Sequence, residues 1–191
     1  MIIHVNGFPG VGKLTVGKLL AAQLGGRLLD NHSIYNIALA LTEFKSPAYY
    51  ETLRAVRAIA YQRVLELPPG VPVVLTNAHM SDSDWGNECW DAVIDLARAR
   101  RVPLFIVVME CSPEENARRI QGLDREEKRK PRDPGMFRGN IEGRPLLDRG
   151  GDHLLRLDVT HLAAADAAAR MAAWIRGKAS ARAGGNQALS P

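Results

Sequence analysis

A glycine-rich segment near the N-terminus constrains this chain more than any other feature. Residues 7–15 read Gly-Phe-Pro-Gly-Val-Gly-Lys-Leu-Thr, which matches the pattern G-x-x-x-x-G-K. An apolar run over residues 2–5 precedes the segment, and a helical pattern over residues 13–24 follows it. Glycines let backbone N–H groups turn toward one centre, and a helix N-terminus adds partial positive charge. The segment therefore predicts a phosphate-binding loop between a first strand and a first helix.

The residues that follow the last glycine of this loop predict how a nucleotide is held. Lys13 is expected to reach the β- and γ-phosphates. Leu14 stands where a Ser or Thr hydroxyl usually binds Mg²⁺, and leucine has no oxygen to offer. Thr15 is adjacent, but one step along a helix turns a side chain about 100° away, which favours a contact with the α-phosphate. We expect the phosphates, waters and a carboxylate to hold Mg²⁺. The nucleotide-binding candidates in the loop are Gly7, Pro9, Gly10, Val11, Gly12, Lys13, Leu14 and Thr15.

Apolar runs and helical patterns alternate along the rest of the chain. Because strands separated by helices favour parallel pairing, the pattern predicts an α/β fold with helices on both faces of a parallel sheet. Strands are expected at 2–5, 27–30, 71–76, 104–109 and 154–159, and helices at 13–24, 49–67, 85–100, from 112 onward, and at 163–175.

Length and composition bound the class of protein. The chain has 191 residues with a net charge of +4, which suits one domain over residues 1–176 with a flexible tail over 177–191. No apolar run reaches the roughly 18 residues of a membrane span, so we expect no membrane association. Cys89 and Cys111 are too few for a disulfide framework and indicate a reduced, cytoplasmic protein. We expect the protein to be a monomer or a homodimer.

Two motifs together resemble one group of P-loop kinases. The loop fits G-x-P-G-x-G-K-x-T, and residues 107–120 read Val-Val-Met-Glu-Cys-Ser-Pro-Glu-Glu-Asn-Ala-Arg-Arg-Ile. Both are similar to the adenylate kinase-like and shikimate kinase-like kinases. The resemblance implies a three-layer P-loop NTPase fold, a five-stranded sheet in the order 2-3-1-4-5, and a small mobile lid at about residues 119–150.

Basic residues are concentrated in this lid region. Residues 118–144 hold nine Lys or Arg against five Asp or Glu, a local excess equal to the +4 of the whole chain. The resemblance places Arg119 near adenine and phosphates, and one or two of Arg125, Arg129 and Arg132 on the γ-phosphate. The alternative is a solvated run of charges. The concentration favours a nucleoside triphosphate over a long nucleic acid as the partner.

Polar residues at the ends of the expected strands are candidates for the acceptor and adenine sites. By resemblance to shikimate kinase-like enzymes, Asp30 would face the acceptor hydroxyl and a metal-bound water; it could orient that hydroxyl or accept its proton. A turn residue is the alternative. His4 is expected to be a satisfied core histidine. The other acceptor candidates are His32, Arg54, Asn77 and His79, and the adenine-loop candidates are Asp158 and Thr160.

These features favour an ATP-dependent phosphotransferase. The γ-phosphoryl group of Mg-ATP would move to a small hydroxyl metabolite, as in shikimate and gluconate kinases. The alternatives are a nucleoside monophosphate kinase of the adenylate or cytidylate type, an AAA-type ATPase without a small acceptor, and a nucleic-acid end kinase. The expected catalytic residues are Lys13, Asp30, Arg119, Arg125, Arg129 and Arg132.

Overall fold

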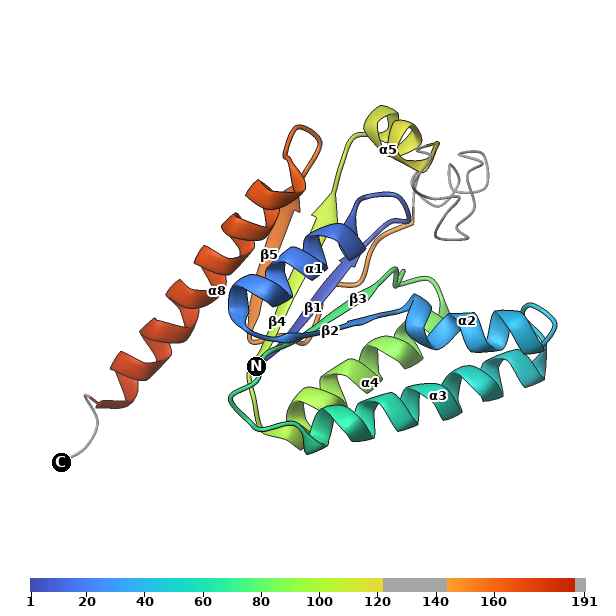
Figure 1. Ribbon diagram of the computed structural model, residues 1–191, viewed down its shortest axis with the longest axis horizontal. Helices are drawn as coiled ribbons and strands as arrows, with labels where there is room; N and C mark the ends of the chain where they lie inside the picture. The colour runs from blue at the N-terminus through green and yellow to red at the C-terminus, as the bar shows by residue number, and fades with distance from the viewer. Residues whose placement is uncertain (122–143, 188–191) are drawn as a thin grey trace.

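The computed structural model describes residues 1–121 and 144–187 (Figure 1). Strands and helices alternate along almost the whole of this part of the chain. The strands are β1 (Ile2–Gly7), β2 (Arg27–Asp30), β3 (Val73–Asn77), β4 (Leu104–Glu110) and β5 (His153–Asp158). The helices are α1 (Lys13–Leu24), α2 (His32–Leu41), α3 (Pro47–Glu66), α4 (Asp84–Arg100), α5 (Pro113–Ile120) and α8 (Ala164–Gln187).

The five strands form one parallel sheet in the order β2-β3-β1-β4-β5. This confirms the predicted fold class and strand order. In the central strand, Ile3 pairs with Val74 on one side and with Phe105 on the other. Since all strands run the same way, their carboxyl ends meet at one edge, where ligands of open α/β sheets bind.

Helices cover both faces of the sheet, which explains why its central strands are almost wholly apolar. Helices α1 and α8 lie on one face, and α3 and α4 lie on the other (Figure 1). Ile3 and Val5 point into the first core, whereas Ile2 and Leu75 point into the second. The second core includes Trp90 of α4, which is buried.

Two parts of the helix assignment differ from the sequence prediction. Helix α2 was not predicted, because only Ile34 and Ala38 of its ten residues are buried and its start reads as a polar turn. Helix α8 continues to Gln187, beyond the predicted end of the last helix at residue 175. Residues 178–183 of this extension are mostly Ala, Lys and Arg, which are strong helix formers. The flexible tail over residues 177–191 stays a prediction.

The predicted lid at about residues 119–150 is described only at its two ends. Helix α5 ends at Ile120, and the chain returns from residue 144 along the loop after β3, where Leu146 forms an antiparallel bridge with Met80. Within the described residues, none of the helices combines the length and apolarity needed to cross a membrane.

Candidate nucleotide and acceptor site

The predicted phosphate loop connects the carboxyl end of β1 to the first residue of α1. Gly10 and Gly12 have φ angles of 91° and 102°, a left-handed conformation that strains any residue with a Cβ. A Cβ on Gly10 would also lie 2.6 Å from Cγ1 of Ile120, whereas the nearest atom to one on Gly12 is Nη1 of Arg119 at 3.9 Å. Gly10 thus permits close packing against α5, and Gly12 leaves the open approach that a phosphate needs.

Lys13 carries its positive charge back over the loop. Its Nζ donates to the carbonyl oxygens of Gly7 at 2.6 Å and Phe8 at 2.8 Å. Because Lys13 is also the first residue of α1, its positive charge adds to the partial positive charge of the helix N-terminus. This arrangement can bind a polyphosphate.

The described residues around the loop do not fit a protein-held Mg²⁺ ion. Leu14 offers no oxygen, Thr15 is exposed one position further along the helix, and a neutral amide, Asn77, ends β3. The oxygens of Asp30 already accept bonds from Thr76 and His32. Within residues 1–121 and 144–187 no three His, Cys, Asp or Glu side chains gather as metal ligands.

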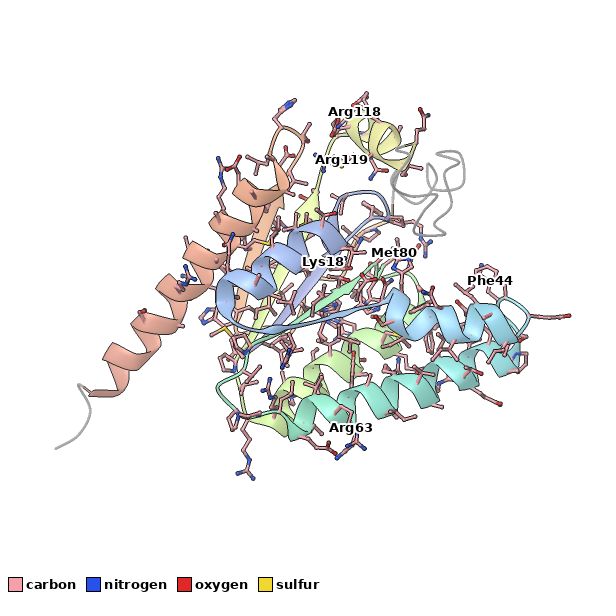
Figure 2. The ribbon with its side chains drawn as sticks, in the orientation of Figure 1. Lys18, Phe44, Arg63, Met80, Arg118 and Arg119 are labelled. Atoms are coloured by element: carbon pink, nitrogen blue, oxygen red, sulfur yellow. The ribbon has the colours of Figure 1, made fainter. Side chains whose placement is uncertain are left out.

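Arg119 of α5 links the phosphate loop to the loop after β5. Its guanidinium donates to the carbonyl oxygens of Val11 at 2.9 Å and Val159 at 2.7 Å, and its Nε donates to Glu115 at 2.6 Å. Hydrogen bonds from Arg118 and Arg119 lower the pKa of Glu115 to about 2. The guanidinium of Arg119 thus connects the phosphate loop with the loop after β5 (Figure 2).

The side chains of Asp158 and Thr160 hold their own turn. Oδ1 of Asp158 accepts from the backbone N–H of Thr160 at 2.8 Å and from its hydroxyl, and these bonds lower the pKa of Asp158. The Thr160 hydroxyl in turn accepts from the N–H of Ser112. Any contact of this loop with an adenine ring would therefore come from its backbone.

Asp30 ends β2 and is buried. Its Oδ1 accepts from the Thr76 hydroxyl of β3 at 2.5 Å, while its Oδ2 accepts from the backbone N–H of His32 at 3.2 Å and lies 2.9 Å from Nδ1 of the same residue. The His32 side chain is 38% exposed. The structure thus brings Asp30 and His32 together as a hydrogen-bonded carboxylate–imidazole pair at the carboxyl edge of the sheet, in which the carboxylate is buried and the imidazole is partly exposed.

Asn77 and His79, the candidates that follow β3, lie beside His4 of β1. Nδ2 of Asn77 lies 3.0 Å from Nε2 of His4, and the ring centroids of His4 and His79 are 5.4 Å apart. His79 is only 4% exposed and packs against Trp90. The ring of His79 is therefore largely covered, and the assignment of His79 to the substrate site stays a prediction. His4 is a core residue as expected, but its Nδ1 has no hydrogen-bond partner among the described residues.

The two buried histidines predict an acid-sensitive fold. Burial lowers the pKa of His4 well below its usual value, with a further contribution from the charge of His79. Burial, followed by the charges of Arg57 and Lys13, lowers the pKa of His79 to about 3. In the unfolded chain both imidazoles bind a proton below about pH 6.5. Between the lowered pKa values of the folded protein and about pH 6.5, the unfolded state binds more protons than the folded state. The two histidines therefore leave the free energy of unfolding at its full value above about pH 6.5, and this free energy falls as the pH is lowered.

We expect the free energy of unfolding to be about 2 kcal/mol lower per histidine at about pH 5 than at about pH 7.5. Urea unfolding at the two pH values measures this difference. A His4→Gln, His79→Gln double variant should lose most of the pH dependence, whatever its absolute stability. An equally steep dependence in that variant would show that other groups cause it.

Arg54, the remaining acceptor candidate, is paired within the protein. Its guanidinium makes a two-pronged contact with Glu88, at 3.0 and 2.7 Å, and lies over the Trp85 ring. Arg57 approaches the same carboxylate at 2.6 Å and stacks on the same ring. The two arginines together lower the pKa of Glu88. One carboxylate thus partly neutralises both guanidinium groups.

The lid arginines Arg125, Arg129 and Arg132 lie outside the described residues, so their roles stay predictions. Sequence reasoning assigned no role to several side chains that build the site. These side chains are Asn6, Thr76, Glu115 and Asn116, whose Nδ2 donates to the carbonyl of Pro9. For Asn6 and Thr76 a signal was available, because each is a polar residue near the carboxyl end of an otherwise apolar strand.

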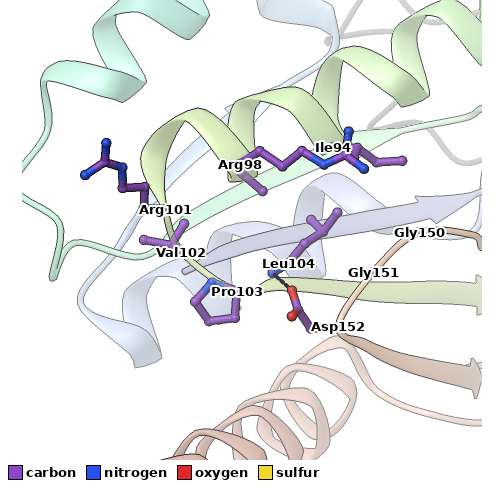
Figure 3. A pocket seen from close by; sticks show the side chains of 10 residues that line it. Ile94, Arg98, Arg101, Val102, Pro103, Leu104, Gly150, Gly151 and Asp152 are labelled. Carbon is purple, nitrogen blue, oxygen red and sulfur yellow. Dashed lines mark hydrogen bonds between the residues drawn. The ribbon is translucent and has the colours of Figure 1, made fainter.

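A separate groove of about 510 Å³ lies at the opposite end of the sheet (Figure 3). It is lined by the end of α4 and the start of β4, including Arg98, Arg101 and Leu104. Asp152 borders it and accepts the N–H of Leu104 at 2.8 Å. Because the phosphate loop follows the carboxyl end of β1, this groove is not part of the nucleotide site.

The fold and this loop define a P-loop nucleotide-binding protein. The family model described as an AAA domain, AAA_18, matches residues 3–144, and the chain belongs to this family. The family and the sheet order confirm the resemblance to the adenylate kinase-like and shikimate kinase-like group.

Relatives with curated descriptions match over part of the chain. A cytidylate kinase from Shewanella denitrificans is 31% identical over 106 residues, which are 53% of this chain and 46% of the relative. A cytidylate kinase from Shewanella loihica is 32% identical over 104 residues, which are 53% of this chain and 45% of the relative. The chain spans about half the length of the curated relatives it matches.

Solved structures share the fold over nearly the whole chain. A candidate kinase from Chloroflexus aurantiacus is 21% identical with a TM-score of 0.65, covering 94% of this chain and 96% of its own. A gluconokinase from Sinorhizobium meliloti is 18% identical with a TM-score of 0.55, and the match covers 92% of this chain and 95% of the gluconokinase. A shikimate kinase from Aquifex aeolicus is 17% identical with a TM-score of 0.51, and the match covers 94% of this chain and 98% of the shikimate kinase. At these identities the likeness concerns the fold alone.

Proposed function

We propose that this protein transfers the γ-phosphoryl group of ATP to a hydroxyl group of a small-molecule acceptor. The observation that carries the proposal is the placement of two functional groups at one edge of the sheet. The Lys13 loop follows β1, and the buried Asp30 carboxylate ends β2, with Thr76 of β3 bound to it from the strand between. A phosphate cradle and a fixed acceptor-side carboxylate are what phosphoryl transfer to a hydroxyl requires.

Each group has a defined role in this proposal. Gly10, Gly12 and Lys13 bind the phosphates, and Lys13 stabilises the charge that develops on the transferring group. Arg119 binds on the nucleotide side, close to Val11. Asp30 orients the acceptor hydroxyl or accepts its proton. Mg²⁺, the usual companion of ATP, would arrive with the phosphates of the nucleotide.

A hydroxyl metabolite is the acceptor that the contacts favour. A nucleoside monophosphate brings a dianionic phosphate, which binds best to unpaired guanidinium groups. Arg54 and Arg57 share Glu88 and stack on Trp85, so within the described residues this side of the site offers little free positive charge. The cytidylate kinase relatives favour the other acceptor class, a nucleoside monophosphate.

We also propose a reducing, cytoplasmic location, because Cys89 and Cys111 are both free thiols.

An ADP-release assay with a panel of acceptors tests the proposal. The panel holds sugar acids, shikimate-like hydroxy acids, aminoglycosides, nucleosides and nucleoside monophosphates. We expect one hydroxyl class to raise the rate of ADP release at least ~10-fold over the rate without acceptor. A response only to nucleoside monophosphates would select the monophosphate kinase. ADP release that ignores every acceptor would instead support the AAA-type ATPase that the family description suggests.

A further inference from the structure

The buried side chain of Asn6 joins segments that lie far apart in the sequence. Asn6 is the residue of β1 directly before the phosphate loop, and it is fully buried. Its Nδ2 donates to the carbonyl oxygens of His79 and Leu147, both at 2.9 Å. Its Oδ1 accepts the backbone N–H of His79 at 2.8 Å. One amide therefore satisfies three buried backbone groups of two other segments.

The two segments that Asn6 holds are themselves paired. Residues 79–82 follow β3 and residues 144–147 follow the undescribed stretch, and we call them the paired segments. The N–H of Leu147 donates to the carbonyl of His79 at 3.0 Å. The remaining contacts are the antiparallel bridge of Met80 with Leu146, the bond from the Ser81 N–H to the Pro145 carbonyl, and the ion pair of Arg144 with Asp82.

On its other side, Asn6 borders the phosphate loop. The next residue, Gly7, presents the carbonyl that accepts from Nζ of Lys13 at 2.6 Å. Gly7 also packs closely on β4, because a Cβ there would lie 2.6 Å from the carbonyl oxygen of Met109 and no side chain fits. The end of β1 thus contacts both the Lys13 ammonium group, through Gly7, and the paired segments, through Asn6.

We propose that Asn6 is a positioning residue for phosphoryl transfer, which holds the paired segments in register with the phosphate loop. This inference rests on the proposed function. An amide is required because the site needs two donors and one acceptor. Aspartate, which has nearly the same shape, keeps the acceptor and loses both donors. A side chain of this kind affects the geometry of the reacting groups more than the binding of the nucleotide.

The test compares Asn6→Asp with a control that loses a similar buried hydrogen bond elsewhere. Arg100→Met is the control, because Arg100 ends α4 and the substitution removes two bonds from its guanidinium, to the carbonyls of Pro68 at 2.8 Å and Val71 at 2.9 Å. With the best acceptor, we expect Asn6→Asp to lower kcat by ~10-fold or more and to change the Kd of a fluorescent ADP by less than ~3-fold. Arg100→Met should lower Tm and leave kcat within ~3-fold of the wild type.

Equal losses of kcat in the two variants would overturn the inference, because any weakened core would then have the same effect. Hydrogen exchange provides a readout that needs no activity. If Asn6→Asp fails to fold, saturating ADP should still slow exchange of the His79 and Leu147 amides of the wild-type protein by several-fold. Protection confined to the phosphate loop would overturn the inference. A wild-type protein that binds ADP and transfers no phosphoryl group would instead contradict the proposed function.

Discussion

Replacing Lys13 with alanine should abolish phosphoryl transfer while leaving the protein folded. The carbonyls of Gly7 and Phe8 hold the ammonium group of Lys13 over the phosphate loop. In the proposed reaction this group stabilises the charge that develops on the transferring phosphoryl group. Removing such a fixed charge should lower kcat by roughly 10³-fold. Alanine is a strong helix former, so α1 should still begin at residue 13.

Lys18→Ala is the matched control for this prediction. Lys18 lies on the same helix, is exposed, and is clear of the phosphate loop (Figure 2). The control should keep full activity, and circular dichroism and Tm should show both variants folded. If Lys13→Ala retained full transfer activity, the assignment of the phosphate loop as the donor site would be wrong.

Asp30→Asn should cause the second largest loss of activity. The substitution keeps the shape of the side chain and removes the negative charge that accepts from Thr76 and His32. If Asp30 orients the acceptor hydroxyl or takes its proton, kcat should fall by about 10²-fold or more. The KM for ATP should change by only about 3-fold, because the proposed function places the nucleotide on the Lys13 side of the site.

Asp152→Asn is the control that loses a carboxylate at the far end of the sheet. Asp152 accepts the N–H of Leu104 beside the groove of Figure 3, well away from the phosphate loop. Steady-state kinetics of both variants with the same acceptor show whether the loss of kcat is specific to Asp30. Wild-type kcat in Asp30→Asn would leave Asp30 with the role of a turn residue.

The sequence predicted the phosphate loop and the positions of the strands because local residues determine them. Gly10 and Gly12 are the residues that a left-handed backbone requires, and continuous apolar runs form strands that are buried on both faces. The order of the strands came from the resemblance. Helix α2 escaped prediction because its buried face has only Ile34 and Ala38, too few to produce a periodic pattern.

The rest of the site depended on partners that a sequence cannot show. Arg54 reads as a free cation, but Glu88 lies 34 residues further along the chain and pairs with it. His79 reads as a polar residue in a loop, but Trp90 and Leu147 cover it. Asn6 belongs to an apolar strand, and its three partners come from residues 79 and 147. Long-range pairing of this kind follows from the fold and not from spacing.

The fate of the γ-phosphoryl group tests the central claim most directly. Wild-type protein and Lys13→Ala are incubated with ATP labelled in the γ-phosphate and with the acceptor that most stimulates ADP release. The account predicts that the label appears on the acceptor hydroxyl in step with ADP in the wild-type reaction, and that Lys13→Ala transfers none. Label found only in inorganic phosphate, at the same rate with and without every acceptor, would contradict it.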